Sequence, residues 1–95
     1  MEFDGFDWDG GNREKCQKHG VSIAEIESVF SRRVLIVDDP DNSEQEPRYR
    51  AIGTTSAGRT AFVVFTRRGS LIRPVSARYM HRKEIDRYEK DNSEL

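Results

Sequence analysis

Three arginines in the second half of the chain have side chains that could bind a polyanion and stabilise charge on a phosphate. Arg59 precedes the apolar run AFVVF, and Arg73 and Arg78 lie within and at the end of LIRPVSAR. A guanidinium group is planar, permanently charged and able to bind two phosphate oxygens at once. RNA can be cut without a metal because its own 2′-OH attacks the adjacent phosphate, and arginines can stabilise the charge that develops there. We therefore take these arginines as candidate catalytic residues; the alternative is that they only make the surface soluble.

Groups that could move protons are scarce. His19 is a candidate general acid or base, because histidine titrates near neutral pH. Its alternative role is that of a cation at a helix C-terminus, stacked on Trp8. His81 lies among basic neighbours and fits a phosphate contact or a helix start. Glu44 and Glu46 could act as a base or could meet a basic partner.

Metal and cofactor chemistry have little support in the sequence. Asp38, Asp39 and Asp41 are close in sequence, but Pro40 and the surrounding composition are typical of a turn. Cys16 is the only cysteine, which excludes an internal disulfide and a cysteine-based zinc site. No glycine-rich phosphate loop precedes a helix. We expect neither a metal nor a cofactor.

Charge is divided unevenly along the 95 residues, although the net charge is only −1. Residues 1–47 hold five Lys or Arg against twelve Asp or Glu, whereas residues 48–90 hold eleven against three. Such asymmetry indicates contact with a nucleic acid or with a charged protein, or simply solvated faces. Under the first interpretation, the candidate RNA-binding residues are Arg48, Arg67, Arg68, Arg82 and Lys18.

The first half of the chain predicts a short strand and two helices. FDGFDWD alternates loosely and predicts an edge strand that ends at Trp8. Asp9 or Asn12 can cap a helix over residues 12–18. In the next helix Ser22 is the N-cap, and Glu25 completes a capping box. The apolar residues of that helix recur at helical spacing and predict one buried face: Ile23, Ile26, Val29 and Phe30.

The second half predicts a sheet followed by a helix. The expected strands cover residues 34–37, 48–53, 59–66 and 71–78, and the final helix covers residues 82–90. Sequential strands with short turns form an antiparallel sheet. The chain is therefore expected to be one α+β domain, residues 1–95, with an antiparallel sheet of three to four strands and helices packed on one face. The other face is left open.

Two residues of the last strand pose a geometric question. Alternation places Arg73 and Arg78 on opposite faces of an ideal strand. They can share one site only if Arg78 lies past the strand end or if Pro74 marks a β-bulge. Because proline has no N–H to donate, its nitrogen should face away from a neighbouring strand.

Nine short motifs occur in an order and spacing that resemble the BrnT toxins of bacterial type II toxin–antitoxin modules. They are WD at 8–9, KHGVS at 18–22, VF at 29–30, DPDNSEQEPRY at 39–49, GR at 58–59, VVFTRRG at 63–69, IR at 72–73, SAR at 76–78 and RKEIDRYE at 82–89. Three positions depart from the family pattern, one of them Pro74, which interrupts the last strand. Asn42 stands where many members carry a histidine, and His81 stands where a Ser or Thr would form a capping box with Glu84.

The resemblance implies a RelE-like fold and a ribonuclease that cleaves mRNA and inhibits translation. It also implies a BrnA-like antitoxin with a ribbon-helix-helix part, so that DNA is met only through the antitoxin. No apolar run approaches the roughly 20 residues of a membrane span, and we expect a cytoplasmic protein without membrane contact. Two alternatives remain: a degenerate member that binds RNA or antitoxin without cutting, and a domain whose basic half binds an acidic protein.

Overall fold

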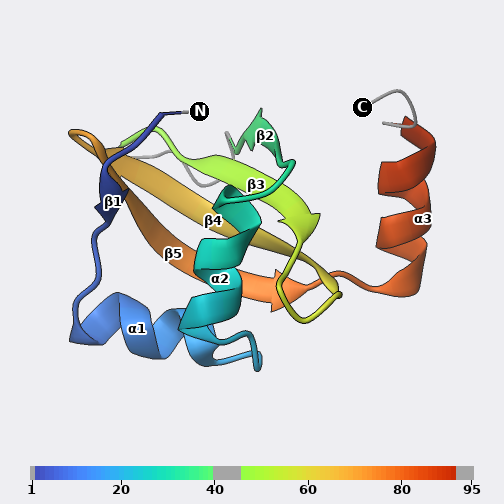
Figure 1. Cartoon of the computed structure of the whole chain (residues 1–95), viewed down its shortest axis with the longest axis horizontal. Helices are drawn as coiled ribbons and strands as arrows, with labels where there is room; N and C mark the ends of the chain where they lie inside the picture. Colours follow the sequence, from blue (N-terminus) through green and yellow to red (C-terminus); the bar gives the residue numbers. More distant parts are fainter. Residues whose placement is uncertain (1, 40–45, 92–95) are drawn as a thin grey trace.

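A computed structural model describes residues 2–39 and 46–91 of the chain (Figure 1). Its strands form one five-stranded sheet in the order β1-β5-β4-β3-β2. Along the chain the elements are β1 (Gly5–Phe6), α1 (Gly10–Gln17), α2 (Ile23–Phe30), β2 (Leu35–Asp38), β3 (Tyr49–Thr54), β4 (Thr60–Arg68), β5 (Leu71–Tyr79) and α3 (Arg82–Asp91). The α+β class is confirmed.

The sheet differs from the predicted one in its number of strands and in one strand direction. Strands β2 to β5 are antiparallel in sequence order, as expected, but β1 adds a fifth strand that runs parallel to β5. The prediction of three to four antiparallel strands was therefore wrong. The backbone N–H of Asp7 donates to the carbonyl of Ile72 at 2.8 Å, and Phe6 packs edge-on against Phe30 with ring centroids 5.6 Å apart. Long-range packing thus places β1 at this edge.

Both N-terminal helices start at capping boxes. Asp9 caps α1 and Asn12 completes the box, so that this helix begins two residues before the predicted start. Ser22 and Glu25 form the predicted box at the start of α2. These local hydrogen bonds satisfy backbone N–H groups that have no partner within the helix.

The core lies between α2 and the sheet. Phe65 is 1% exposed, and the centroid of its ring lies 5.1 Å from that of Phe30 and 5.5 Å from that of Tyr49. Gly53 of β3 lies directly under α2, because a Cβ there would meet Val29 Cγ1 of this helix at 3.5 Å and the carbonyl oxygen of Arg33, which follows the helix, at 3.2 Å. A side chain at this position would push α2 away from the sheet.

A β-bulge in β5 answers the question of Arg73 and Arg78. Ser76 lies opposite Val64 and Pro74 lies opposite Phe65, so Val75 is the extra residue. With this residue inserted, Ile72 and Ala77 both point into the core. Arg73 and Arg78, which follow these residues, therefore share the opposite face.

Pro74 has the orientation that its missing N–H requires. Its carbonyl oxygen accepts a hydrogen bond of 2.9 Å from the buried side chain of Asn12 on α1. Within a strand, the nitrogen and carbonyl of one residue point to the same side. The Pro74 nitrogen therefore faces α1 and leaves the ladder to β4 intact.

The last helix corrects the prediction that the helices pack on one face. Helices α1 and α2 do so, but α3 projects beyond the end of the sheet (Figure 1). None of its residues is buried. Among the described residues, no helix is long and apolar enough to cross a membrane.

Candidate functional site

The side of the sheet opposite α2 carries a concentration of arginines. We call it the helix-free face. Along each strand, every second residue points into the core, and the residues between them point to the helix-free face. The residues of this face include Leu35, Val37, Arg48, Arg50, Ile52, Phe62, Val64, Thr66, Arg68, Arg73 and Arg78. Val37 is 39% exposed, the one large apolar side chain of the described residues that is classed as exposed.

Two guanidinium groups meet one aromatic ring on this face. The Cζ atom of Arg78 lies 4.3 Å from the ring centroid of Phe62, and that of Arg50 lies 4.8 Å from it. The register explains the meeting, because Arg78 is directly opposite Phe62 and Arg50 is opposite Val64. Contact with an aromatic face stabilises a guanidinium and limits its freedom. Both guanidiniums are therefore positioned on the ring before any ligand binds.

A carboxylate holds each guanidinium of the pair. Glu84, in the first turn of α3, accepts hydrogen bonds of 2.8 Å from both terminal nitrogens of Arg78. The Asp39 carboxylate is 3% exposed and lies 3.8 Å from Arg50. The hydrogen bonds from Arg78, with that from the His81 backbone N–H, lower the pKa of Glu84 to about 2. Glu84 is thus ionised at neutral pH, and its hydrogen bonds with Arg78 raise the pKa of that arginine.

The Glu84 contact predicts an acid-sensitive attachment of α3. The pKa of Glu84 is about 2 in the folded chain against 4.5 for a free side chain, so the contact between Glu84 and Arg78 is fully stabilising above pH 4.5. It should weaken as the pH falls from 4.5 toward 2. The measurement is the pH dependence of the Ile85 amide resonance, compared with a Glu84→Gln variant that cannot titrate. An identical pH dependence in both proteins would contradict the assignment.

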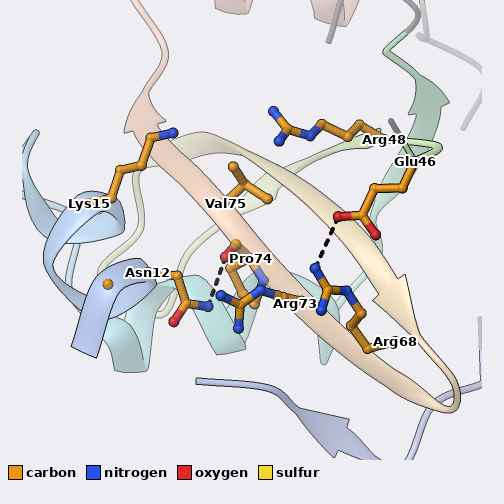
Figure 2. A pocket seen from close by; sticks show the side chains of 9 residues that line it. Asn12, Lys15, Glu46, Arg48, Arg68, Arg73, Pro74 and Val75 are labelled. Carbon is orange, nitrogen blue, oxygen red and sulfur yellow. Dashed lines mark hydrogen bonds and ion pairs between the residues drawn. The ribbon is translucent and has the colours of Figure 1, made fainter. Parts of the chain in front are cut away.

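Further along the same face, a groove of about 410 Å³ lies between α1 and β5. Figure 2 shows Lys15 and Arg48 pointing toward one another across Val75, the extra residue of the bulge. Arg68 and Arg73 line the same groove. The structure therefore brings together three residues that the sequence proposed separately, Arg48, Arg68 and Arg73, and adds Lys15.

Acidic side chains hold two of these arginines. Arg73 lies 2.8 Å from the Asp9 carboxylate and 3.4 Å from that of Asp7, and the hydrogen bond to Asp9 is the main cause that raises the pKa of Arg73. Arg68 donates to Glu46 at 3.1 Å (Figure 2). Glu46 therefore meets a basic group of its own chain.

Two predicted arginines lie on the other side of the sheet. The guanidinium of Arg59 is 3.7 Å from the ring of Tyr79, whose hydroxyl donates to Glu25 of α2. Arg67 is opposite the core residue Ile72 and donates to the carbonyl of Glu2 at 3.1 Å. The structure does not bring Arg59 together with Arg78.

The remaining predicted residues are dispersed. His19 is exposed between α1 and α2, while Arg13, not His19, lies over the Trp8 ring, at 5.9 Å. Lys18 lines a shallow hollow on α1 next to the groove, and Arg82 is paired with Asp86 on α3. Further positions discussed above lie outside the described residues: Pro40, Asp41, Asn42 and Glu44.

Several residues of the face were missed by sequence reasoning. Arg50 lies two residues after Arg48 and so shares its face, which was a usable indication. Phe62 was assigned to a strand that is apolar on both sides, and nothing local distinguishes it from Phe65. Glu84 was considered only as a helix cap.

The described residues offer neither a metal-binding cluster nor a reactive thiol. Across residues 2–39 and 46–91, no three His, Cys, Asp or Glu side chains are close enough to hold one metal ion. Cys16 is fully buried, and burial raises the pKa of its thiol to about 11. The thiol is therefore protonated at neutral pH.

Paired arginines and a basic groove on one sheet face of a small α+β protein are groups that could bind phosphate. The family model described as "Ribonuclease toxin, BrnT, of type II toxin-antitoxin system" matches residues 8–84, and the chain belongs to this family. A type II system implies an antitoxin partner. A comparison with curated proteins found no match.

Proposed function

We propose that this chain is an endoribonuclease toxin that cuts RNA without a metal, by attack of the RNA's own 2′-OH, and so inhibits translation. The observation that carries the proposal is the meeting of Arg50 and Arg78 on the ring of Phe62. Family membership supports ribonuclease activity. The arginine pair supports the mechanism, because guanidinium groups bind the non-bridging oxygens of phosphates and these two contact the same ring on one face of the sheet.

In this mechanism the arginines stabilise the transition state. Charge builds on the phosphate oxygens as the 2′-OH attacks, and donors that are already oriented act most strongly on it. Glu84 and Asp39 orient Arg78 and Arg50, while the Phe62 ring keeps them together.

His81 is our candidate for proton transfer at this site. Glu84 cannot donate a proton at neutral pH, because its pKa is about 2. The exposed His81 is three residues from Glu84, and its charged form is close enough to contribute to the lowered pKa of that carboxylate. A histidine so placed can exchange protons with RNA bound at Arg78. His19, the candidate from the sequence, lies in the loop between α1 and α2.

The proposed partner is a BrnA-like antitoxin with a ribbon-helix-helix part, which would bring DNA contact only indirectly. Type II antitoxins act by binding the toxin protein, and the helix-free face offers them basic groups and the exposed Val37. We place the complex in the cytoplasm, where RNA and antitoxin are available. Growth should stop when this chain is expressed alone and resume when its antitoxin is co-expressed.

The mechanism predicts cleavage in the presence of excess EDTA. Because guanidiniums supply the positive charge, purified protein should cut a defined RNA as fast with EDTA as with Mg²⁺. Attack by the 2′-OH leaves a 2′,3′-cyclic phosphate or its opened 3′-phosphate on one fragment and a 5′-hydroxyl on the other. Mapping of the fragment ends is the measurement.

Three outcomes separate the proposal from its alternatives. Activity lost in EDTA and restored by Mg²⁺, or 5′-phosphate ends, would contradict the mechanism and direct attention to Asp39, Asp41 and Glu44. RNA binding without cleavage would indicate a degenerate binding module. Absence of RNA binding at low salt would indicate a protein-binding domain.

A further inference from the structure

We propose that the groove between α1 and β5 is a separate subsite that binds a backbone phosphate of the RNA, away from the phosphate that is cut. This inference rests on the proposed function, since it takes RNA as the ligand. It assigns Arg73, a catalytic candidate from the sequence, to binding. The residues that carry it are Lys15, Arg48, Arg68 and Arg73.

The groove has the shape and donors that a phosphate requires. Lys15 comes from the last turn of α1 and Arg48 immediately precedes β3, and Figure 2 shows their charged ends facing each other above Val75. The bulge that inserts Val75 also places Arg73 on this face. A phosphate between Lys15 and Arg48 would accept hydrogen bonds from two sides, because the two residues belong to different parts of the fold.

Two arginines of the groove have carboxylate partners within the described residues. Arg73 forms ion pairs with Asp7 and Asp9. It therefore lines the groove in a fixed position, and its charge is largely neutralised. Arg68 is paired with Glu46 at 3.1 Å, and both side chains are well exposed, at 50% and 36%. Exposed pairs of this kind are weak. An entering phosphate can therefore replace Glu46 as the partner of Arg68, which makes Glu46 an internal competitor of the ligand.

One RNA strand can reach both sites because they lie on the same face. Arg78 is opposite Phe62 and Arg73 is opposite Thr66, four residues further along β4. At about 3.4 Å per residue this separates the two levels by roughly 14 Å. Among residues 2–39 and 46–91 no helix lies across the face between them, since α2 packs on the other side, α1 borders the groove at the β5 edge and α3 projects away (Figure 1). Continuity with the arginine pair favours RNA over an acidic protein as the ligand.

The test uses an RNA twelve nucleotides long with all 2′-OH groups methylated, so that binding is measured without cleavage. Lys15→Ala and Arg48→Ala should each weaken binding about tenfold, as for one lost charged contact. Each should also reduce the slope of log K against log salt by about 0.7. Glu46→Gln should strengthen binding, because Arg68 is released. Arg32→Ala, an exposed arginine after α2, is the matched control and should change nothing.

A methylated trinucleotide, too short to occupy both sites, completes the design. Its affinity at the arginine pair should be the same in all these variants, provided circular dichroism shows them folded. Unchanged twelve-nucleotide binding in Arg48→Ala and Lys15→Ala, or weaker binding in Glu46→Gln, overturns the subsite. Cleavage of unmethylated RNA reports separately on the proposed function: a wild-type protein that binds but never cuts refutes the nuclease and leaves the subsite standing. Variants that bind RNA normally but lose affinity for an acidic peptide would assign the groove to a protein partner instead.

Discussion

The Arg78→Ala variant is expected to cut RNA about 10²–10³ times more slowly than the wild-type chain. Loss of one oriented donor to a transition state typically has an effect of about this size. Arg78 is oriented by two hydrogen bonds of 2.8 Å to Glu84 and by the ring of Phe62. The measurement is kcat/KM on a defined RNA.

Controls distinguish chemistry from folding and from the alternative arginine. Arg78→Lys should remain strongly impaired, because lysine keeps the charge but not the planar fork. Arg59→Ala should retain most activity, since Arg59 lies on Tyr79 on the opposite side of the sheet. Equal losses in Arg59→Ala and Arg78→Ala would move the active site to the Tyr79 side. Thermal unfolding of each variant shows whether the fold is kept.

The Phe65→Ala variant is expected to lose about 3–5 kcal/mol of unfolding free energy, the usual effect of removing a buried phenylalanine. A chain of this length has roughly 5–14 kcal/mol in total. Phe65 is 1% exposed and contacts both Phe30 of α2 and Tyr49 of β3, so its loss opens a cavity at the centre of the core. Chemical denaturation measures the change.

Phe62→Ala is the matched control on the same strand. Phe62 points to the helix-free face and is only half-buried, so the loss of stability should be clearly smaller than for Phe65→Ala. Cleavage should nevertheless fall, because Arg50 and Arg78 lose the ring that holds them together. Equal destabilisation by the two substitutions would contradict the assignment of the two faces.

Local features of this fold were readable from the sequence. The capping box of Ser22 and Glu25 involves residues three apart, so its geometry is independent of the rest of the chain. The apolar runs located β2 to β5 within one or two residues. The bulge was foreseen as one of two ways to place Arg73 and Arg78 on one face, because alternation constrains both positions.

Features that depend on pairing between distant segments were not readable. The position of β1 beside β5 joins residues more than 60 apart and depends on aromatic packing with Phe30. Arg50 meets Phe62 only through the register of β3 on β4. Arg59 and Arg78 were both candidates because both are arginines. Ala61 lies opposite Tyr79 on the helix side of the sheet, and Arg59, two residues before Ala61, lies on the same side. Side-chain type identified candidates, and the register of the sheet separated them.

The central claim is that RNA binds the helix-free face. It is tested most directly by the NMR signals of the arginine Nε–H groups, followed while a fully 2′-O-methylated RNA is added. The account predicts large changes for Arg50 and Arg78 and smaller ones at Arg48 and Arg68, while Arg59 and Arg67 on the helix side stay unchanged. Changes confined to Arg59 and Arg67, with Arg50 and Arg78 unaffected, would contradict it.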